Sequence, residues 1–221
     1  MDRDETEPHE SVATHLELPN PVDTHQFTFV GLHYNPVGHA PPGIYTIPHF
    51  DFHFYVVGED LVEGIGPGPG IATYEVPDRQ IPEGYVFENP RLIVPEMGEH
   101  LLDETAPEFG DGEFTHTYVY GAYDPGIDPE KPSGTKEVEM QGETQELPVF
   151  EGDGEGQLHF VEAMVTNEFM TGLGEGVTTD VATPEAFQTE GHYPTAYSVT
   201  PNESGATVSI EGFEAFPGTA E

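Results

Sequence analysis

Glycine and proline interrupt this chain so often that they exclude a fold built on long helices. The 221 residues include 26 Gly and 22 Pro, and both residue types end or weaken helices. Between them lie short runs rich in β-branched and aromatic residues, such as 114–120 and 158–165, which are typical of strands. About eight such runs with turn signals between them predict a mainly β fold. We expect a single-domain antiparallel β-barrel with short helices, and a β-sandwich is the alternative.

The predicted domain organisation is simple. Residues 1–20 are polar and acidic, which indicates a flexible lead-in, and residues 21–221 form the single β domain. Residues 124–155 hold many Asp, Glu, Gly and Pro but few apolar residues, so they are predicted as an exposed acidic loop insertion, and a small hairpin within it stays open. Short helices are expected to begin near Asn167 and at residues 183–185, where Thr183 would cap a helix that has Pro184 in its first turn.

The charge of the chain narrows its possible partners. Five Lys and Arg stand against 42 Asp and Glu, a formal net charge of −37. Nucleic-acid binding is excluded, because neutralising phosphates requires basic residues. Acidity of this degree also occurs in disordered chains, but the aromatic strand patterns argue against disorder here. We therefore expect a surface adapted to high salt, as in halophilic proteins, because the Debye length falls to about 3 Å at 1 M salt.

The chain contains no Cys, so disulfides, thiolate metal sites and Cys nucleophiles are excluded. No apolar run reaches the ~18–20 residues that a membrane-spanning helix needs, so no membrane insertion is expected. The first residues lack the basic and apolar regions of a signal peptide. Localisation stays open: the protein is cytoplasmic if Met1 is the native start and extracellular if the chain is a shortened form of an exported protein.

Residues 48–55, Pro-His-Phe-Asp-Phe-His-Phe-Tyr, carry the strongest functional signal. On a strand, His49, Asp51 and His53 point to one face and the three Phe side chains to the other. The first face offers metal ligands or acid–base groups, and the second offers an aromatic wedge for the core. The alternative is a buried polar network in which Asp51 orients both imidazoles and nothing binds.

The spacing of these three residues limits how they can share an ion. Residues two apart on a strand are separated by ~6.6 Å and residues four apart by ~13 Å, whereas metal–ligand bonds measure ~2.0–2.2 Å. Three arrangements stay open. One His joins Asp51 around the ion and the other lies outside, or a bulge gathers all three residues, or Asp51 bridges two sites. The first two arrangements are favoured.

Further ligands must come from other segments. His100 follows a Gly turn and is the first choice, and Glu162 is an unusual carboxylate within an apolar strand. His39 and His116 are weaker candidates. A set of His and carboxylate ligands without Cys favours Zn²⁺, with Mn²⁺, Fe²⁺ or Ni²⁺ as alternatives.

These residues predict a metal-binding protein, with a metal-dependent hydrolase or lyase as the enzymatic form. In that form His49, Asp51, His53 and His100 are the metal ligands and Glu162 is the catalytic base. The alternative is a non-catalytic binding or assembly protein, a possible homo-oligomer, in which the cluster is a structural metal site or a polar network. The identity of any small-molecule ligand stays open.

The chain also resembles an uncharacterised domain family of bacteria and archaea that carries the Pro-His-Phe-Asp-Phe-His-Phe-Tyr motif, and it looks like a haloarchaeal-type member. The shared segments are residues 35–45, 48–55, 97–100, 120–123, 160–166 and 193–197. This chain has Ala163 where the family pattern has Pro, and it carries residues 124–155 where the pattern has almost none. The resemblance implies that His49, Asp51, His53, His100 and Glu162 form one site, and it implies no particular activity.

Overall fold

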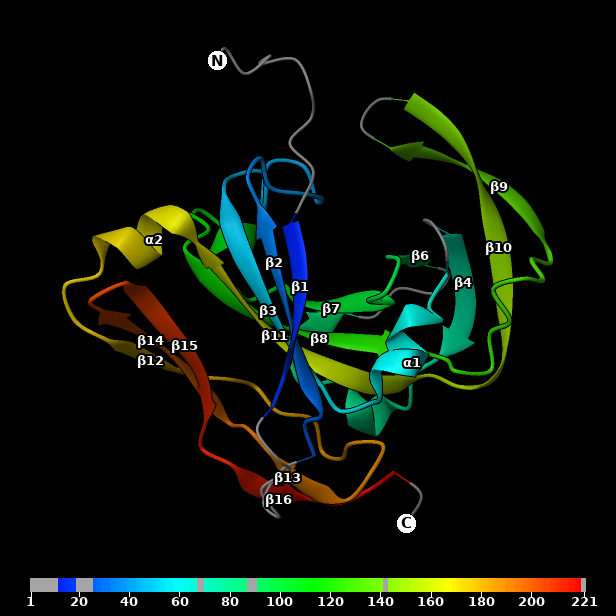
Figure 1. Cartoon of the computed structure of the whole chain (residues 1–221). Coiled ribbons are helices and arrows are strands. Elements are labelled where there is room, and N and C mark those ends of the chain that lie inside the picture. The colour runs from blue at the N-terminus through cyan, green and yellow to red at the C-terminus, as the bar shows by residue number, and fades with distance from the viewer. Residues whose placement is uncertain (1–11, 19–25, 67–69, 87–90, 141–142, 220–221) are drawn as a thin grey trace.

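The computed structural model describes residues 12–18, 26–66, 70–86, 91–140 and 143–219. Its main feature is a seven-stranded sheet in the order β1-β2-β3-β11-β8-β7-β5, in which all neighbours run antiparallel (Figure 1). The strands are β1 (Val12–Glu17), β2 (Phe29–Asn35), β3 (His49–Tyr55), β5 (Tyr85–Val86), β7 (Glu99–Asp103), β8 (His116–Tyr123) and β11 (Gln157–Thr166).

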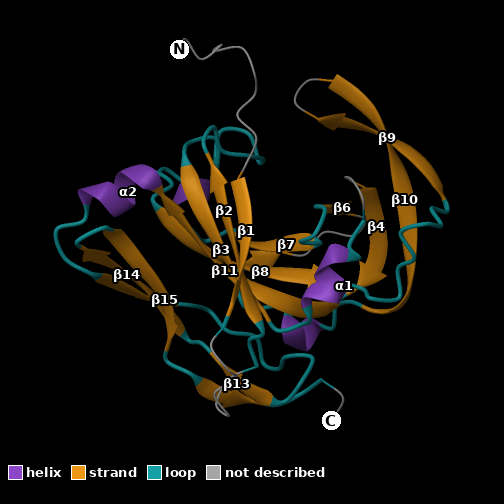
Figure 2. Cartoon of the chain, viewed as in Figure 1, coloured by secondary structure: helices purple, strands orange, loops and turns teal. Residues whose placement is uncertain are grey.

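Three smaller sheets surround this one. The first has the order β6-β4-β10-β9, the second β12-β14-β15, and the third pairs β13 with β16. Their strands are β4 (Gly70–Glu75), β6 (Arg91–Ile93), β9 (Gly134–Met140), β10 (Glu143–Glu155), β12 (Val177–Asp180), β13 (Gly191–Tyr193), β14 (Ala196–Asn202), β15 (Gly205–Glu211) and β16 (Glu214–Phe216). The fold is therefore mainly β, as predicted, and Figure 2 shows how little of the chain is helical.

The predicted barrel is wrong, because no sheet in the described residues closes on itself. A barrel requires the first and last strands of a sheet to pair, but β1 and the two-residue strand β5 lie at opposite edges of the large sheet. One face of that sheet instead packs against the sheet of β12, β14 and β15: Phe52 and Phe54 of β3 join a core cluster that also holds Tyr197 and Val199 of β14. The arrangement is sandwich-like, which was the alternative.

Two predicted segments look different in the structure. Val12–Glu17, within the expected lead-in of residues 1–20, pairs with β2 as the strand β1; residues 1–11 lie outside the described residues. Residues 124–155, expected as a loop insertion, include β9 and the whole of β10; β9 pairs with residues 143–149 of β10 to form a hairpin that projects from the body of the protein in Figure 1. Beyond this hairpin, β10 continues as a parallel neighbour of β4, so the segment is built into a sheet.

The helices are short. They are α1 (Glu59–Glu63) and α2 (Asn167–Gly172), and the Thr166 hydroxyl caps α2 by accepting the amide of Phe169 at 3.2 Å. The helix expected at residues 183–185 is absent, because that segment is tied to a distant part of the chain: the Ala186 amide donates to the carbonyl of Arg79 in the 3₁₀ helix η1 (Asp78–Gln80), which with η2 (Pro107–Phe109) is a single turn. Among the described residues, no helix has the length and apolar character that crossing a membrane would require.

The two faces of β3 reverse the usual division between polar surface and apolar core. His49, Asp51 and His53 are 0%, 4% and 0% exposed, whereas the Phe side chains between them are only partly buried. Tyr45 and Phe114 pack over the polar face, and the Phe114 ring lies 5.3 Å from that of His49. Burying ionisable groups is costly unless they are paired or bind an ion, so this face needs a chemical explanation.

Candidate metal centre

Strand pairing places seven polar side chains on the buried face of the large sheet. Asn35 and His33 of β2 lie opposite His49 and Asp51 of β3, and Glu162 of β11 lies opposite His53. His100 of β7 lies opposite Gly121 of β8, and Gly121 in turn lies opposite Phe160 of β11. Because directly paired residues of antiparallel strands share a face, these side chains converge although they come from four segments.

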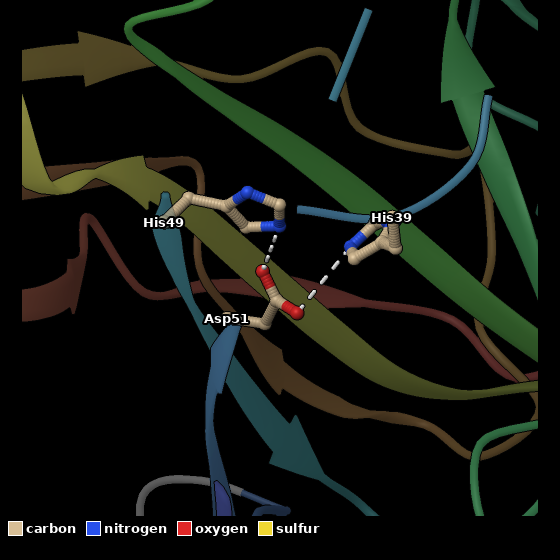
Figure 3. A group of neighbouring side chains, drawn as sticks. All are labelled: His39, His49 and Asp51. Carbon is tan, nitrogen blue, oxygen red and sulfur yellow. Dashed lines mark ion pairs between the residues drawn. The ribbon is translucent and has the colours of Figure 1, made fainter. Parts of the chain in front are cut away.

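Two of these residues, His49 and Asp51, form what we call the outer group together with His39 from a neighbouring loop. The Nε2 atom of His49 lies 3.2 Å from Oδ1 of Asp51, and the Nε2 atom of His39 lies 3.5 Å from Oδ2 (Figure 3). His39 comes from the loop between β2 and β3, a weaker candidate by sequence. The two oxygens of one carboxylate thus each face an imidazole.

Backbone contacts fix the orientation of both imidazoles. The Nδ1 atom of His49 lies 2.7 Å from the Ile47 carbonyl, and the Nδ1 atom of His39 lies 2.7 Å from the Ala40 carbonyl. A carbonyl only accepts, so each Nδ1 carries the proton, and each Nε2 is left for a proton or an ion on the Asp51 side. Metal-binding histidines are commonly oriented in this way.

The loop that carries His39 is shaped by a glycine. Gly38 has a φ of 73°, and a Cβ there would lie 2.1 Å from the Tyr45 carbonyl oxygen, so no other residue fits. The same carbonyl accepts the amide of His39 at 2.9 Å. The turn therefore holds His39 above β3 and next to Asp51.

Asp51 has several partners but keeps one oxygen without a hydrogen bond. Asn35 donates from Nδ2 to Oδ2 at 2.5 Å, whereas the buried Oδ1 makes no hydrogen bond within the described residues. Burial acts to raise the pKa of Asp51, but the close contacts and charge of His39 and His49 outweigh it and lower this pKa well below its usual range. Burial likewise acts against protonation of His39, yet contact with Asp51 raises the pKa of His39. The outer group therefore holds an ionised carboxylate.

The inner group, as we call it, consists of His53, His100 and Glu162. The Nε2 atoms of His53 and His100 lie 3.4 Å and 3.5 Å from the same oxygen, Oε2 of Glu162. His53 and Glu162 are almost fully buried, and neither Nε2 of His53 nor Oε2 of Glu162 makes a hydrogen bond within the described residues. Burial, and then the negative charge of Asp51, raises the pKa of Glu162 well above its usual range.

His33 is a site residue that the sequence analysis missed. Its Nδ1 atom lies 3.1 Å from Nδ1 of His53, so one of the two nitrogens carries a hydrogen and the other accepts it. Burial, and then the charge of His33, lowers the pKa of His53 well below its usual value. The only sequence signal was position: His33 lies in a strand-like run that ends just before the loop leading to His49.

The predicted site residues are thus divided between two groups. β3 pairs with β2 and β11 in continuous register, so no bulge gathers the triplet; His49 stays with Asp51, and His53 joins His100 and Glu162. His116 belongs to neither group, because it lies opposite Val165 on the other face of the sheet, where its Nδ1 lies 2.5 Å from the Tyr197 hydroxyl.

Both groups could hold a metal ion, although their chemistry does not identify the metal. The resemblance to an uncharacterised domain family stays a prediction. Comparisons of this chain with protein-family models, with curated proteins and with solved structures found no match.

Proposed function

We propose that this protein binds a divalent metal ion at the outer group, through Nε2 of His39, Nε2 of His49 and the carboxylate of Asp51. One observation carries the proposal: two imidazoles held by backbone carbonyls aim their Nε2 atoms at the two oxygens of one buried carboxylate. Ligand atoms ~2.0–2.2 Å from a tetrahedral ion lie ~3.4 Å from one another. Each imidazole lies close to that separation from one carboxylate oxygen, 3.2 Å for His49 and Oδ1 and 3.5 Å for His39 and Oδ2, and one ligand atom from each residue lies within 4.8 Å of the others.

The outer group also suits an ion that exchanges with solvent. The side chain of His39 is 40% exposed, whereas those of His49 and Asp51 are almost fully buried. Both groups offer three protein ligands, so exposure distinguishes them: at the outer group the exposed side of His39 lets water reach a fourth ligand position. Zn²⁺ is the metal of this proposal, because two imidazoles and a carboxylate hold catalytic zinc ions; the same ligands also bind Fe²⁺, and Mn²⁺ and Ni²⁺ are further alternatives.

An ion with a bound water would make hydrolysis or a lyase reaction the corresponding chemistry, because a divalent metal lowers the pKa of its water. The sequence assigned the role of general base to Glu162. Glu162 lies with His53 and His100 rather than in the outer group, so in this proposal the water at the outer ion is deprotonated by solvent or by a substrate group.

The test is metal binding followed by Co²⁺ spectroscopy. Purified protein is depleted of metal, loaded with Zn²⁺ in excess Mg²⁺ to occupy exposed carboxylates, and compared with His39→Gln and His49→Gln; the exposed His192→Gln serves as control. We expect both site variants to lose one ion that wild type and control bind. Azide should then change the visible spectrum of the Co²⁺ form if a ligand position is open. Equal zinc binding by all four proteins would refute the proposal, and a spectrum insensitive to azide would refute the open position.

We also propose that the surface is adapted to high salt. The net charge of −37 creates strong self-repulsion in dilute buffer, and ~1 M KCl screens it. The melting temperature should therefore rise by more than about 10 °C between dilute buffer and 1 M KCl. This rise corresponds to a gain of about 3–5 kcal/mol in the free energy of unfolding, because about 1 kcal/mol shifts the melting temperature by about 2–4 °C at this chain length. An unchanged melting temperature would refute the adaptation.

A further inference from the structure

We infer that the inner group is a second, separate metal site, whose ion links β3, β7 and β11 and serves a structural role. Its ligands are Nε2 of His53, Nε2 of His100 and Oε2 of Glu162, and it shares no ligand with the outer group. The inference therefore stands or falls independently of the proposed function.

The first support is a pair of buried atoms that lack hydrogen bonds. His53 and Glu162 are 0% and 1% exposed, and Nε2 of His53 and Oε2 of Glu162 face each other at 3.4 Å without hydrogen-bond geometry. Buried polar atoms are nearly always satisfied, and an exception calls for a missing water or ion. The 3.5 Å separation between Nε2 of His100 and the same oxygen completes a three-ligand set.

The second support is a glycine on β8 that lets side chains of β7 and β11 meet across it. β8 separates β7 from β11 in the sheet, and it presents Gly121 at the point where His100 would otherwise meet a side chain. A Cβ at Gly121 would lie 1.9 Å from the ring of Phe160. That ring occupies the space and contacts both imidazoles, with centroids 4.8 Å from His53 and 5.2 Å from His100.

The third support is the contact that orients His53. For Nε2 of His53 to bind an ion, its Nδ1 must carry the proton and donate it to Nδ1 of His33, 3.1 Å away. His33 is then the positioning residue of this site, in the role that carbonyls play for the outer imidazoles. Its side chain is buried, so solvent does not compete for this contact.

Burial separates the roles of the two sites. His100 is the most exposed ligand of the inner group, with 20% of its side chain accessible, against 40% for His39 in the outer group. Little room for exchange and ligands from three strands are typical of a structural ion, which stabilises the fold by binding only the folded state.

The experiment counts zinc ions and measures what each contributes to stability. Native mass spectrometry and melting curves, both in excess Mg²⁺, compare wild type with His100→Gln and Glu162→Gln for the inner group and His39→Gln for the outer group. His116→Gln is the control, because His116 lies on the other face of the sheet and outside both groups. We expect two ions in wild type and control, and one ion in each site variant. Zinc about 100-fold above the dissociation constant of the inner site should raise the melting temperature by about 5–10 °C through that site. The inner-group variants should lose this contribution, while His39→Gln keeps it.

A His33→Gln variant tests the orienting contact without removing a ligand. The Gln amide oxygen can accept from Nδ1 of His53, whereas Phe cannot, so His33→Phe should weaken inner-site zinc binding about 10–100-fold and His33→Gln should recover most of it. Binding of only one zinc ion by wild type, unaltered binding of two by His100→Gln, or loss of the stabilisation in His39→Gln instead would each overturn the inference. The wild-type count needs no variant, so the inference is decided even if a variant fails to fold.

Discussion

The outer and inner groups contain the same kinds of side chain and both include residues of β3, yet the surroundings shift the pKa values of their carboxylates in opposite directions. Asp51 in the outer group receives a hydrogen bond from Asn35 and faces two imidazoles, and contact with His39 and His49 lowers its pKa despite burial. Glu162 in the inner group also faces two imidazoles and, like Asp51, keeps one oxygen without a hydrogen bond within the described residues, but burial, and then the charge of Asp51, raises its pKa.

This difference shows that residue composition alone does not set the state of a buried carboxylate. The outer group already contains the donors that stabilise a negative charge, so it can persist without an ion. The inner group stabilises a negative charge on Glu162 less, so this carboxylate requires either a proton or a bound cation. The predictions below test this contrast, beginning with the largest expected effect.

Replacing Gly121 should damage the inner group and spare the outer one. In Gly121→Ala, the new methyl group would lie 1.9 Å from the Phe160 ring, so the ring that packs on His53 and His100 must move. We expect the free energy of unfolding to fall by about 3 kcal/mol, as for severe overpacking, with zinc binding lost at the inner group only. Urea unfolding in molar KCl measures the change.

Gly134→Ala is the matched control, because Gly134 is an exposed residue of strand β9 and a Cβ there would meet nothing within 4 Å. It should stay within about 0.5 kcal/mol of wild type, as surface changes usually do. If Gly121→Ala were equally mild, the Phe160 ring would have room to move, and the packing account of the inner group would be wrong.

Acid should lower the free energy of unfolding through His159, which packs beside the inner group. This buried imidazole packs on Phe160 with ring centroids 4.9 Å apart, and burial, opposed by backbone hydrogen bonds, lowers its pKa to about 4. The unfolded chain binds the proton more readily, at a pKa near 6.5. Stability from neutral His159 is therefore complete above about pH 6.5 and is lost as pH falls toward 4.

The loss from His159 should be about 2 kcal/mol between pH 7 and pH 5. His39 of the outer group should affect stability in the opposite direction with pH. Its pKa is raised in the folded protein, so its stabilising contribution is present at low pH and is lost as pH rises through that pKa. Metal-free His159→Gln should show a flatter decline of urea midpoint on acidification than wild type, while the exposed His192→Gln should follow wild type. Parallel curves for all three proteins would contradict the role of His159.

Much of the local pattern could be predicted from the sequence. The alternation at 49–55 predicts β3 and its two faces, and Glu162 stands out as a carboxylate within an apolar strand. Strand rise alone indicates that His49 and His53 are too far apart for one ion without a bend, and the structure places them in different groups.

The remaining features depend on pairings between distant segments. His33 enters the site only because β2 pairs with β3 in a register that sets it opposite Asp51, and His39 enters through the conformation of a loop. Open and closed sheets have the same strand alternation, so the pattern could not exclude a barrel. Which face of β3 is more buried depends on the residues of other segments that pack over it, such as Tyr45 and Phe114. The sequence of the strand itself does not specify these residues.

The smallest effect compares two isosteric changes in the metal-free protein. Asp51→Asn replaces an ionised acceptor by an amide, and it loses charge-assisted contacts with His39 and His49. Hydrogen bonds to charged groups contribute about 1.5–3 kcal/mol, so we expect a loss near about 1.5 kcal/mol. Glu162→Gln should cost less than about 0.5 kcal/mol at neutral pH, because a raised pKa favours the neutral acid, whose shape and charge the amide reproduces.

With zinc bound, the order should reverse for stability. Glu162→Gln removes a ligand of the structural ion, so the variant should gain little from zinc, whereas Asp51→Asn should keep the gain that the inner ion supplies. Chemical denaturation of both variants, with zinc and with chelator, gives the four free energies. The contrast between the groups requires the two variants to exchange rank. Equal costs for both variants in chelator would show that their carboxylates share one ionisation state and would remove the distinction between the two groups.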